Sequence, residues 1–218
     1  MRLAIFDLDN TLLAGDSDHA WGCFLADVGA VDGAAYEQAN NQFFEAYKNG
    51  TLDIGAYLAF ALEPLRVTPM ATLLAWRQRF LQEWIRPMIP KASRALIRAH
   101  REAGDQLLII TATNRFVTAP IAAELGVPNL LATEPEMRDG CFTGQALLPA
   151  CFQDGKITRL NAWVARYGIT LEGACFYSDS HNDLPLLRQV DEPIAVNADP
   201  ELAQVAKAAG WRQIELTH

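Results

Sequence analysis

The sequence predicts an α/β fold in which a parallel sheet forms the core and an all-helical segment is inserted after the first strand. Two observations support this prediction. Short apolar runs suited to buried strands alternate with helical segments, and one long stretch near the N-terminus contains helical patterns alone. Strands that alternate with helices are typical of parallel sheets, because each parallel connection needs a crossover, which is usually a helix.

Four apolar runs are predicted to be strands buried on both faces, because each is short, almost continuously apolar and bounded by polar residues. These runs are 3–6, 106–110, 174–177 and 193–196. A less regular stretch at 134–145, which contains Gly140 and Gly144, predicts a hairpin. The core is therefore expected to hold four parallel strands and one hairpin.

Helical segments are predicted between these strands. They are 91–103, 115–125, 157–167 and 199–209, and they stop at Gly104, Gly126, Gly168 and Gly210. Glycine readily adopts the left-handed conformation that closes a helix, so the four glycines mark helix ends.

Residues 16–88 interrupt this alternation, because they contain only helical patterns. The helices predicted there are 18–28, 34–49, 54–62 and 69–84, separated by Gly29, Gly50 and Pro64. Glycine and proline are the strongest local breakers of a helix. We therefore predict two units, a core made of 1–15 and 89–218 and a helical cap made of 16–88.

Charge and composition narrow the classes of partner. The chain has 218 residues, of which 50% are hydrophobic, and a formal net charge of −8. An acidic chain without a basic run disfavours nucleic acid and anionic membranes, both of which need a basic surface. No apolar run approaches the length that spans a bilayer. We expect a small-molecule partner, and the sequence does not indicate an oligomeric state.

The cysteines and the N-terminus indicate a compartment. Cys23, Cys141, Cys151 and Cys175 are scattered and form no CxxC pair. Such spacing predicts reduced thiols rather than a disulfide framework. The first apolar run ends at Asp7 and is too short for a signal peptide. We expect a cytoplasmic protein.

Polar clusters follow three of the predicted strands, and a DGK tripeptide opens the helix at 157. The residues concerned are Asp7 and Asp9; Thr111, Thr113 and Asn114; Lys156; and Asp179, Asn182 and Asp183. In open parallel sheets, ligands bind just beyond the carboxyl ends of the strands. We therefore expect these side chains to face one crevice, with Lys156 within reach of it.

These residue types suit phosphoryl chemistry. Carboxylate oxygens are the ligands that Mg²⁺ prefers, and a hydroxyl, a lysine and loop amides bind phosphoryl oxygens. An aspartate is also a competent nucleophile toward phosphorus. The sequence contains no GxSxG elbow, no GxxxxGK[ST] loop and no zinc-type cluster of His and Cys.

In this combination the chain resembles the phosphatases of the haloacid dehalogenase (HAD) superfamily, in the branch of phosphoserine phosphatase. DLDNT matches the family's DxDxT motif, and SDSHND matches its acidic fourth motif. Thr111 matches the hydroxyl of the second motif, and Lys156 matches the lysine of the third. The resemblance covers 3–196 and implies a Rossmann-like core with a helical cap inserted after the first motif.

The resemblance implies a catalytic role for four residues. Asp7 is expected to attack phosphorus, and Asp9 to protonate the departing alcohol and later to take a proton from water. Thr111 and Lys156 are expected to bind phosphoryl oxygens.

The resemblance also implies a Mg²⁺ cofactor. The expected ligands are the Asp7 side chain, the main-chain carbonyl of Asp9 and the Asp179 side chain. Asn182 and Asp183 are expected to lie behind them and to orient the metal's waters and Lys156.

The expected substrate-binding residues are Asp16, Asp18, Thr113 and Asn114. In phosphoserine phosphatases, a glutamate nine residues after the nucleophile receives the substrate ammonium and a cap arginine binds its carboxylate. Here Asp16 occupies the first position, and the predicted helix 54–62 contains no cation. A carboxylate buried without a partner is costly, so we expect an amino-alcohol phosphate, first histidinol phosphate and then phosphoethanolamine-like compounds. Arg66 is the alternative partner for a carboxylate.

Three alternatives stay open at this point: a phosphoserine phosphatase, a phosphotransferase on the same fold, and a non-catalytic ligand-binding protein. The histidines are not assigned to the chemistry. His181 is expected in a partly exposed loop, His19 and His100 on helix surfaces, and His218 at a frayed terminus.

Overall fold

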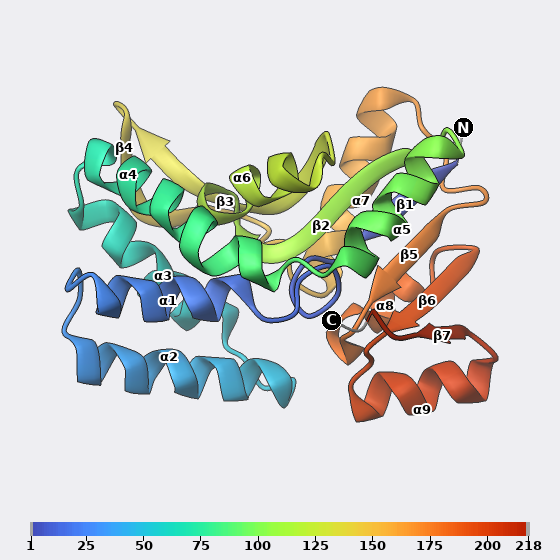
Figure 1. Cartoon of the computed structure of the whole chain (residues 1–218), viewed down its shortest axis with the longest axis horizontal. Helices are drawn as coiled ribbons and strands as arrows, with labels where there is room; N and C mark the ends of the chain where they lie inside the picture. Colours follow the sequence, from blue (N-terminus) through green and yellow to red (C-terminus); the bar gives the residue numbers. More distant parts are fainter. Residues whose placement is uncertain (1, 217–218) are drawn as a thin grey trace.

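The computed structural model describes residues 2–216. They form one seven-stranded sheet with helices around it (Figure 1). The strands are β1 (Leu3–Phe6), β2 (Gln106–Asn114), β3 (Asn129–Arg138), β4 (Cys141–Leu147), β5 (Cys175–Ser178), β6 (Glu192–Val196) and β7 (Arg212–Ile214). Their order is β4-β3-β2-β1-β5-β6-β7, and β4 alone among the described strands is antiparallel to its neighbour. β1 therefore lies where the strand order reverses, which is where ligands bind in such sheets.

Helices cover both faces of the sheet, with α5 and α6 in front of it and α7 behind it in Figure 1. α5 (Lys91–Glu102) and α6 (Arg115–Leu125) pack on one face, and α7 (Asp154–Tyr167), α8 (Leu184–Leu187) and α9 (Pro200–Ala209) pack on the other. Alternate side chains of a strand point to opposite faces. In β1, Ala4 and Phe6 join the first core cluster, and Leu3 and Ile5 join the second. The α/β fold is confirmed.

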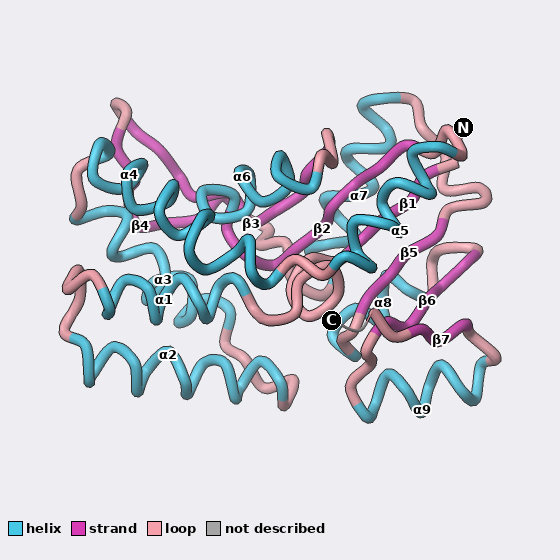
Figure 2. Tube along the Cα trace, in the orientation of Figure 1, coloured by secondary structure: helices cyan, strands magenta, loops and turns pink. Residues whose placement is uncertain are grey.

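Between β1 and β2 the described chain contains helices and loops (Figure 2). The elements are α1 (Ser17–Asp27), α2 (Gly33–Lys48), α3 (Ile54–Val67), α4 (Met70–Phe80), a π-helical turn (Leu81–Ile85), a 3₁₀ turn (Arg86–Met88) and α5. α1 and α2 lie side by side, and the Asn40 side chain donates to the His19 carbonyl at 2.9 Å. The first core cluster continues into these helices through Trp21 and Phe24. We retain 16–88 as the proposed cap.

No single described helix has the length and hydrophobicity needed to cross a membrane. The pair Ile54–Val67 and Met70–Met88 meets the criteria of length and composition together, and it is bent by 115° at its break.

Two expectations about the elements are corrected. Pro64 was expected to separate helices, but it lies inside α3. Proline removes one helical hydrogen bond, and here Leu58, Leu62 and Leu65 are buried on both sides of it, so packing compensates for the loss. The first half of β3, 129–133, and strand β7 were not expected, because β3 mixes polar with apolar residues and β7 has only three residues. The hairpin is confirmed, since β3 pairs with β4 around Asp139 and Gly140.

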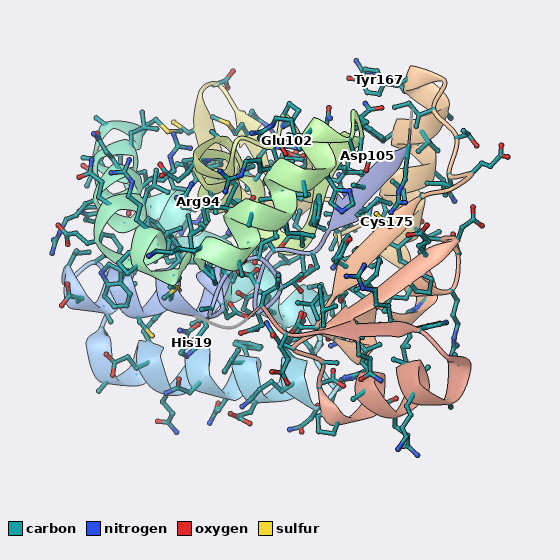
Figure 3. The ribbon with its side chains drawn as sticks, turned by 45° about the vertical axis from the view of Figure 1, so that its right-hand side comes forward. His19, Arg94, Glu102, Asp105, Tyr167 and Cys175 are labelled. Carbon is teal, nitrogen blue, oxygen red and sulfur yellow. The ribbon has the colours of Figure 1, made fainter. Side chains whose placement is uncertain are left out.

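His100 is a third correction, because its side chain is only 11% exposed rather than on the helix surface. Its Nδ1 lies 2.7 Å from Asp105 Oδ2, and its Nε2 lies 2.8 Å from the Tyr177 hydroxyl. Asp105 and Cys175, labelled in Figure 3, stand where β2 and β5 begin. The His100 ring thus links Asp105, just before β2, to the Tyr177 side chain of β5. His218 lies outside the described residues.

Candidate active site

Three neighbouring parallel strands end at one edge of the sheet. Asp7 directly follows β1, Asp179 directly follows β5, and Thr111 and Thr113 lie near the end of β2. The Asp7 amide donates to the Tyr177 carbonyl at 2.9 Å, which extends the pairing of β1 and β5 up to the site. The structure thus brings the three predicted polar clusters together at the point where the strand order reverses.

Lys156 bridges two aspartates in this crevice. Its Nζ donates to Asp7 Oδ1 at 2.7 Å and to Asp183 Oδ2 at 2.8 Å, and all three side chains are almost completely buried. Burial by itself lowers the pKa of Lys156, but the Asp183 and Asp7 carboxylates together raise that pKa above its ordinary value. Burial raises the pKa of Asp7, and Lys156 opposes the rise. Ser178 completes the group by donating to Asp183 Oδ2 at 2.7 Å.

A tight turn places Lys156 in the first turn of α7. Gln153, just before the helix, has a φ of 45°. A Cβ added to Gly155 would lie 1.8 Å from the Ala150 carbonyl oxygen, which leaves no room for a side chain. Glycine is therefore required at 155 by close approach of the backbone, and the lysine that follows it reaches the crevice.

Both oxygens of the Asp9 carboxylate accept hydrogen bonds. The Ser17 amide donates to Oδ1 at 2.6 Å, and the Thr113 hydroxyl donates to Oδ2 at 2.8 Å. The Thr111 hydroxyl lies farther from the same Oδ2, at 3.3 Å. Burial and the nearby Asp16 raise the pKa of Asp9 to about 6, while the contacts with Ser17 and Thr113 oppose the rise.

Asp179 contacts Thr11, a residue that sequence reasoning left unassigned. The Thr11 hydroxyl donates to Asp179 Oδ1 at 3.0 Å and accepts from the Asp179 amide at 3.0 Å. The sequence did contain a signal that could have identified this residue, because Thr11 is the threonine of the DLDNT motif. Burial and the nearby Asp7 carboxylate raise the pKa of Asp179 well above its ordinary value. Carboxylate oxygens are ligands that divalent cations accept, so Asp7 and Asp179 could hold one.

Asn182 and Asn114 bind protein groups in this structure. Asn182 accepts from the Gln153 side chain at 3.0 Å and donates to the Tyr47 carbonyl at 3.1 Å, which links the motif loop to the end of α2. Asn114 caps α6 by accepting from the Val117 amide at 3.2 Å. Thr113 lines the cavity described next, and Asn114 is not among the described residues that line it.

A cavity extends from the aspartates toward the proposed cap. Its core side is formed by Asp7, Asp9, Thr111, Ala112 and Thr113. Its cap side is formed by Asp16, Asp18 and His19 of the α1 region, by Asn40, Phe43, Phe44 and Tyr47 of α2, and by Leu52, Ile54 and Tyr57. None of the described lining residues is a lysine or an arginine. The cavity is therefore acidic and partly aromatic.

Asp16 and Asp18 lie at the start of helix α1, on the cap side of this cavity. Asp16 is the N-cap, and its Oδ1 accepts from the amides of Asp18 and His19 at 2.9 and 2.8 Å. Burial raises the pKa of Asp16 to about 7, with a contribution from Asp18. Burial also raises the pKa of Asp18 to about 7, and the Tyr57 hydroxyl opposes the rise. Sequence reasoning missed Tyr57, because nothing local connects it to Asp18.

His19, labelled in Figure 3, lies between α1 and α2. Its ring stacks on Phe44 with centroids 4.6 Å apart, and its Nε2 lies 2.7 Å from Asn41 Oδ1. The histidine therefore belongs to the wall of the cavity and lies close to the carboxylates of α1.

The fold and this arrangement of aspartates, lysine and threonine are those of a hydrolase. Residues 4–188 match the family model of the haloacid dehalogenase-like hydrolases, and the chain belongs to that family. The expectation of a phosphatase of this family is confirmed by its named relatives.

Two relatives and two solved structures show where the chain lies in the family. It is 46% identical over 214 residues to a histidinol-phosphatase of Neisseria meningitidis serogroup C (strain 8013), covering 96% of each chain. It is 34% identical to phosphoserine phosphatase SerB1 of Mycobacterium tuberculosis (strain ATCC 25618 / H37Rv), covering 95% of this chain and 68% of the relative. A Bordetella pertussis Tohama I protein of unknown function matches with a TM-score of 0.94 and 44% identity, over 99% of each chain. A substrate-bound phosphoserine phosphatase has a TM-score of 0.72 at 18% identity, over 99% of this chain and 93% of that one, which shows a shared fold.

Proposed function

We propose that the protein is a Mg²⁺-dependent phosphomonoesterase that passes the phosphoryl group first to Asp7 and then to water. The observation that carries this proposal is the position of Asp7 at the end of β1, with one oxygen held by Lys156 and the proton-transfer candidate Asp9 two residues away. The Lys156 contact holds the orientation of the carboxylate, and the ammonium opposes the charge that develops on the phosphoryl oxygens.

The reaction has two balanced steps. In the first, an Asp7 oxygen attacks phosphorus, the bond from phosphorus to the ester oxygen breaks, and the Asp9 proton passes to that oxygen so that an alcohol leaves. In the second, Asp9 takes a proton from water as the water oxygen attacks phosphorus, the bond from phosphorus to Asp7 breaks, and inorganic phosphate leaves. The Thr111 hydroxyl and Lys156 bind phosphoryl oxygens in both steps.

The donor set of this site suits Mg²⁺. The described residues contain no cluster of three His, Cys, Asp or Glu side chains placed to hold a metal. The proposed set needs only two, Asp7 and Asp179, together with the main-chain carbonyl of Asp9 and water, which matches the preference of Mg²⁺ for oxygen ligands and for retained waters. A bound Mg²⁺ would reduce the repulsion between the Asp7 carboxylate and the phosphate dianion.

We infer that the substrate is a cationic alcohol phosphate, with histidinol phosphate first. Asp16 and Asp18 offer carboxylates to ammonium and imidazolium groups, and Phe43, Tyr47 and Tyr57 offer aromatic surface. The similarity to a histidinol-phosphatase supports this choice. None of the described residues that line the same cavity is a lysine or an arginine that would receive a substrate carboxylate.

Arg66, the alternative partner for a carboxylate, is engaged elsewhere. Its Nε donates to Glu63 at 2.7 Å, and its side chain is 49% exposed. It packs against Gly144 of the hairpin and is not among the residues that line the cavity. This position disfavours phosphoserine, whose carboxylate would be buried without a partner.

Two measurements test the proposed function. The first measures kcat/KM for three esters on the same preparation with Mg²⁺. We expect the highest value for histidinol phosphate, a lower one for phosphoethanolamine and the lowest for L-phosphoserine. A clear preference for phosphoserine would contradict the assignment of the cavity. Added acceptor alcohols test the alternative function, a phosphotransferase. We expect inorganic phosphate as the product, and a new phosphate ester of the added alcohol would favour transfer instead.

We place the protein in the cytoplasm, where its four free cysteines stay reduced.

A further inference from the structure

Asp9 is held from two sides that are distant in the sequence. On the core side, the Thr113 hydroxyl donates to Oδ2 at 2.8 Å, and on the cap side the Ser17 amide donates to Oδ1 at 2.6 Å. Thr113 is only 3% exposed, and Ser17 is fully buried. A carboxylate bound at both oxygens cannot rotate about its Cβ–Cγ bond without breaking a hydrogen bond.

We propose that the Thr113 hydroxyl and the Ser17 amide are positioning groups that orient Asp9 for proton transfer to the leaving oxygen. The inference rests on the proposed function, in which Asp9 protonates the departing alcohol. Proton transfer needs the donor within hydrogen-bond reach of the acceptor, and small displacements of a catalytic group are costly. A fixed carboxylate therefore accelerates this step more than a mobile one.

Thr113 is better suited to this role than its neighbour Thr111. The Thr111 hydroxyl is 3.3 Å from Asp9 Oδ2 and also accepts from the Thr113 amide at 3.2 Å. A phosphoryl oxygen in the site would attract the Thr111 proton, because charged acceptors form the stronger hydrogen bonds. The Thr113 hydroxyl then remains as the core-side donor to Asp9.

The Ser17 amide couples Asp9 to the proposed cap. Ser17 is the first residue of α1, where an amide has no partner within the helix and points out of its positive end. A shift of α1 away from the core would remove this donor from Asp9. Proton transfer is thus favoured when the cap helix is seated on the site.

The core-side test removes the Thr113 hydroxyl with little change of shape, in Thr113→Val. We measure release of alcohol in the first turnover, once with histidinol phosphate and once with 4-nitrophenyl phosphate. An alkoxide needs a proton to leave, whereas 4-nitrophenolate leaves readily without one. We expect on the order of 10–10²-fold slower release of histidinol with KM within about threefold of wild type, and a change of no more than about threefold for nitrophenolate.

Two variants serve as controls on this arm. Thr113→Ser keeps the hydroxyl and is expected to stay within about threefold of wild type for both esters. Thr118→Val removes another buried threonine hydroxyl, one that donates to the Asn114 carbonyl at 3.0 Å, and is expected to show no dependence on the leaving group. Retained release of nitrophenolate in Thr113→Val shows that the site is assembled.

The cap-side test removes the Ser17 amide, in Ser17→Pro. Proline is tolerated at the first position of a helix, and Asp16 before it has the extended backbone that proline favours, with φ −104° and ψ 116°. We expect the same selective slowing of histidinol release. Ser17→Ala keeps the amide and removes only the hydroxyl, so slowing in Ser17→Pro beyond that in Ser17→Ala measures the contribution of the amide.

The outcomes separate this inference from the proposed function. Wild-type protein that hydrolyses neither ester would overturn both. Slowing of both leaving groups to the same extent in Thr113→Val, or failure of Thr113→Ser to restore the rate, would overturn the positioning role alone. If Ser17→Pro does not fold, the Thr113 variants decide the question.

Discussion

At the scale of single residues, the site depends on Lys156, which donates hydrogen bonds to two aspartates. Lys156 is buried between Asp7 and Asp183, and a buried charge is tolerated when charged partners surround it. Removing one partner leaves the other carboxylate to hold the ammonium. Asp7, the proposed nucleophile, can therefore be changed without leaving the lysine unpaired.

The first prediction follows from this sharing. Asp7→Asn should keep the fold, because Asp183 still holds Lys156, and should lower kcat by at least about 10³-fold, because an amide cannot form the acyl phosphate. Asp9→Asn should lower kcat by about 10²–10⁴-fold through loss of proton transfer. Circular dichroism and steady-state kinetics test both, with the exposed turn variant Asp139→Asn as the matched control. Near-normal turnover in Asp7→Asn would exclude the proposed nucleophile.

The second prediction concerns Asp18 and pH. Because the pKa of Asp18 is raised to about 7, its carboxylate becomes ionised as pH rises through that value. KM for phosphoethanolamine, whose ammonium stays charged over this range, should fall between pH 6 and pH 8. Asp18→Asn should weaken this dependence and lower kcat/KM by about 10–10²-fold. Asp27→Asn, an exposed change on the same helix, is the control, and equal pH profiles in the two variants would contradict the role of Asp18.

The same pKa predicts a change in stability. An acid whose pKa is raised by folding binds more protons when folded, so its contribution to stability is lost as pH rises from its unfolded value to about 7. Asp18→Asn should therefore raise the free energy of unfolding at pH 8 by on the order of 2 kcal/mol in the absence of ligand. Urea denaturation at pH 5 and pH 8 measures the free energy of unfolding of both proteins. A stabilisation by Asp18→Asn that is larger at pH 5 than at pH 8 would contradict a raised pKa of Asp18.

At the scale of elements, helix α7 positions Lys156 and strand β1 positions Asp7, the proposed nucleophile. The first turn of α7 is packed against the Ala150 carbonyl, so its placement depends on the absence of a side chain at Gly155. An error in that turn displaces Lys156 relative to Asp7. Catalysis and stability are consequently coupled at this glycine.

The third prediction tests that coupling. Gly155→Ala should destabilise the protein by about 2–4 kcal/mol, since the added Cβ would overlap the carbonyl oxygen. It should also lower kcat, because Lys156 moves with the turn. Gly33→Ala at the start of α2 is the control, where a Cβ meets nothing within 4 Å. Urea denaturation and kinetics should separate the two variants, and equal stability would contradict the close approach at Gly155.

At the scale of the whole molecule, the cavity between the sheet and the proposed cap gathers negative charge. Asp7, Asp9, Asp16 and Asp18 line it, and Asp179 lies beside Asp7. Burial raises the pKa of each, so their ionised forms are unfavourable without cations. A metal at one end and a cationic substrate at the other would offset this charge.

The fourth prediction concerns the metal. Mg²⁺ at about 100 times its Kd should stabilise the protein by about 2.7 kcal/mol, which corresponds to a rise of roughly 5–10 °C in Tm. A strong chelator should abolish activity, and Ca²⁺ should inhibit because its larger and more flexible shell disturbs the geometry. Asp179→Asn should remove most of the thermal shift, whereas Asp139→Asn should keep it. Full activity in excess chelator would refute the metal assignment.

The sequence by itself determined the α/β class, the end of β1 and the motif residues. These features are local, because a buried strand needs a continuous apolar run and the polar residue after it lies at the sheet edge. The predicted end of β2 was wrong, because Thr111, Thr113 and Asn114 lie in the last residues of that strand instead of after it. The sequence did not determine every helix end. Helix α3 continues past Pro64, because the buried residues on both sides of the proline pack into the core.

Only the tertiary structure decided which side chains meet. It joined Asp9 to Thr113 and to Ser17, and it brought Tyr57 to Asp18 and the Tyr47 carbonyl to Asn182. These partners come from different helices and strands, so no periodicity or spacing relates them. Their contacts depend on how the helices after β1 pack over the sheet edge, and that packing is the sum of many apolar contacts between distant segments.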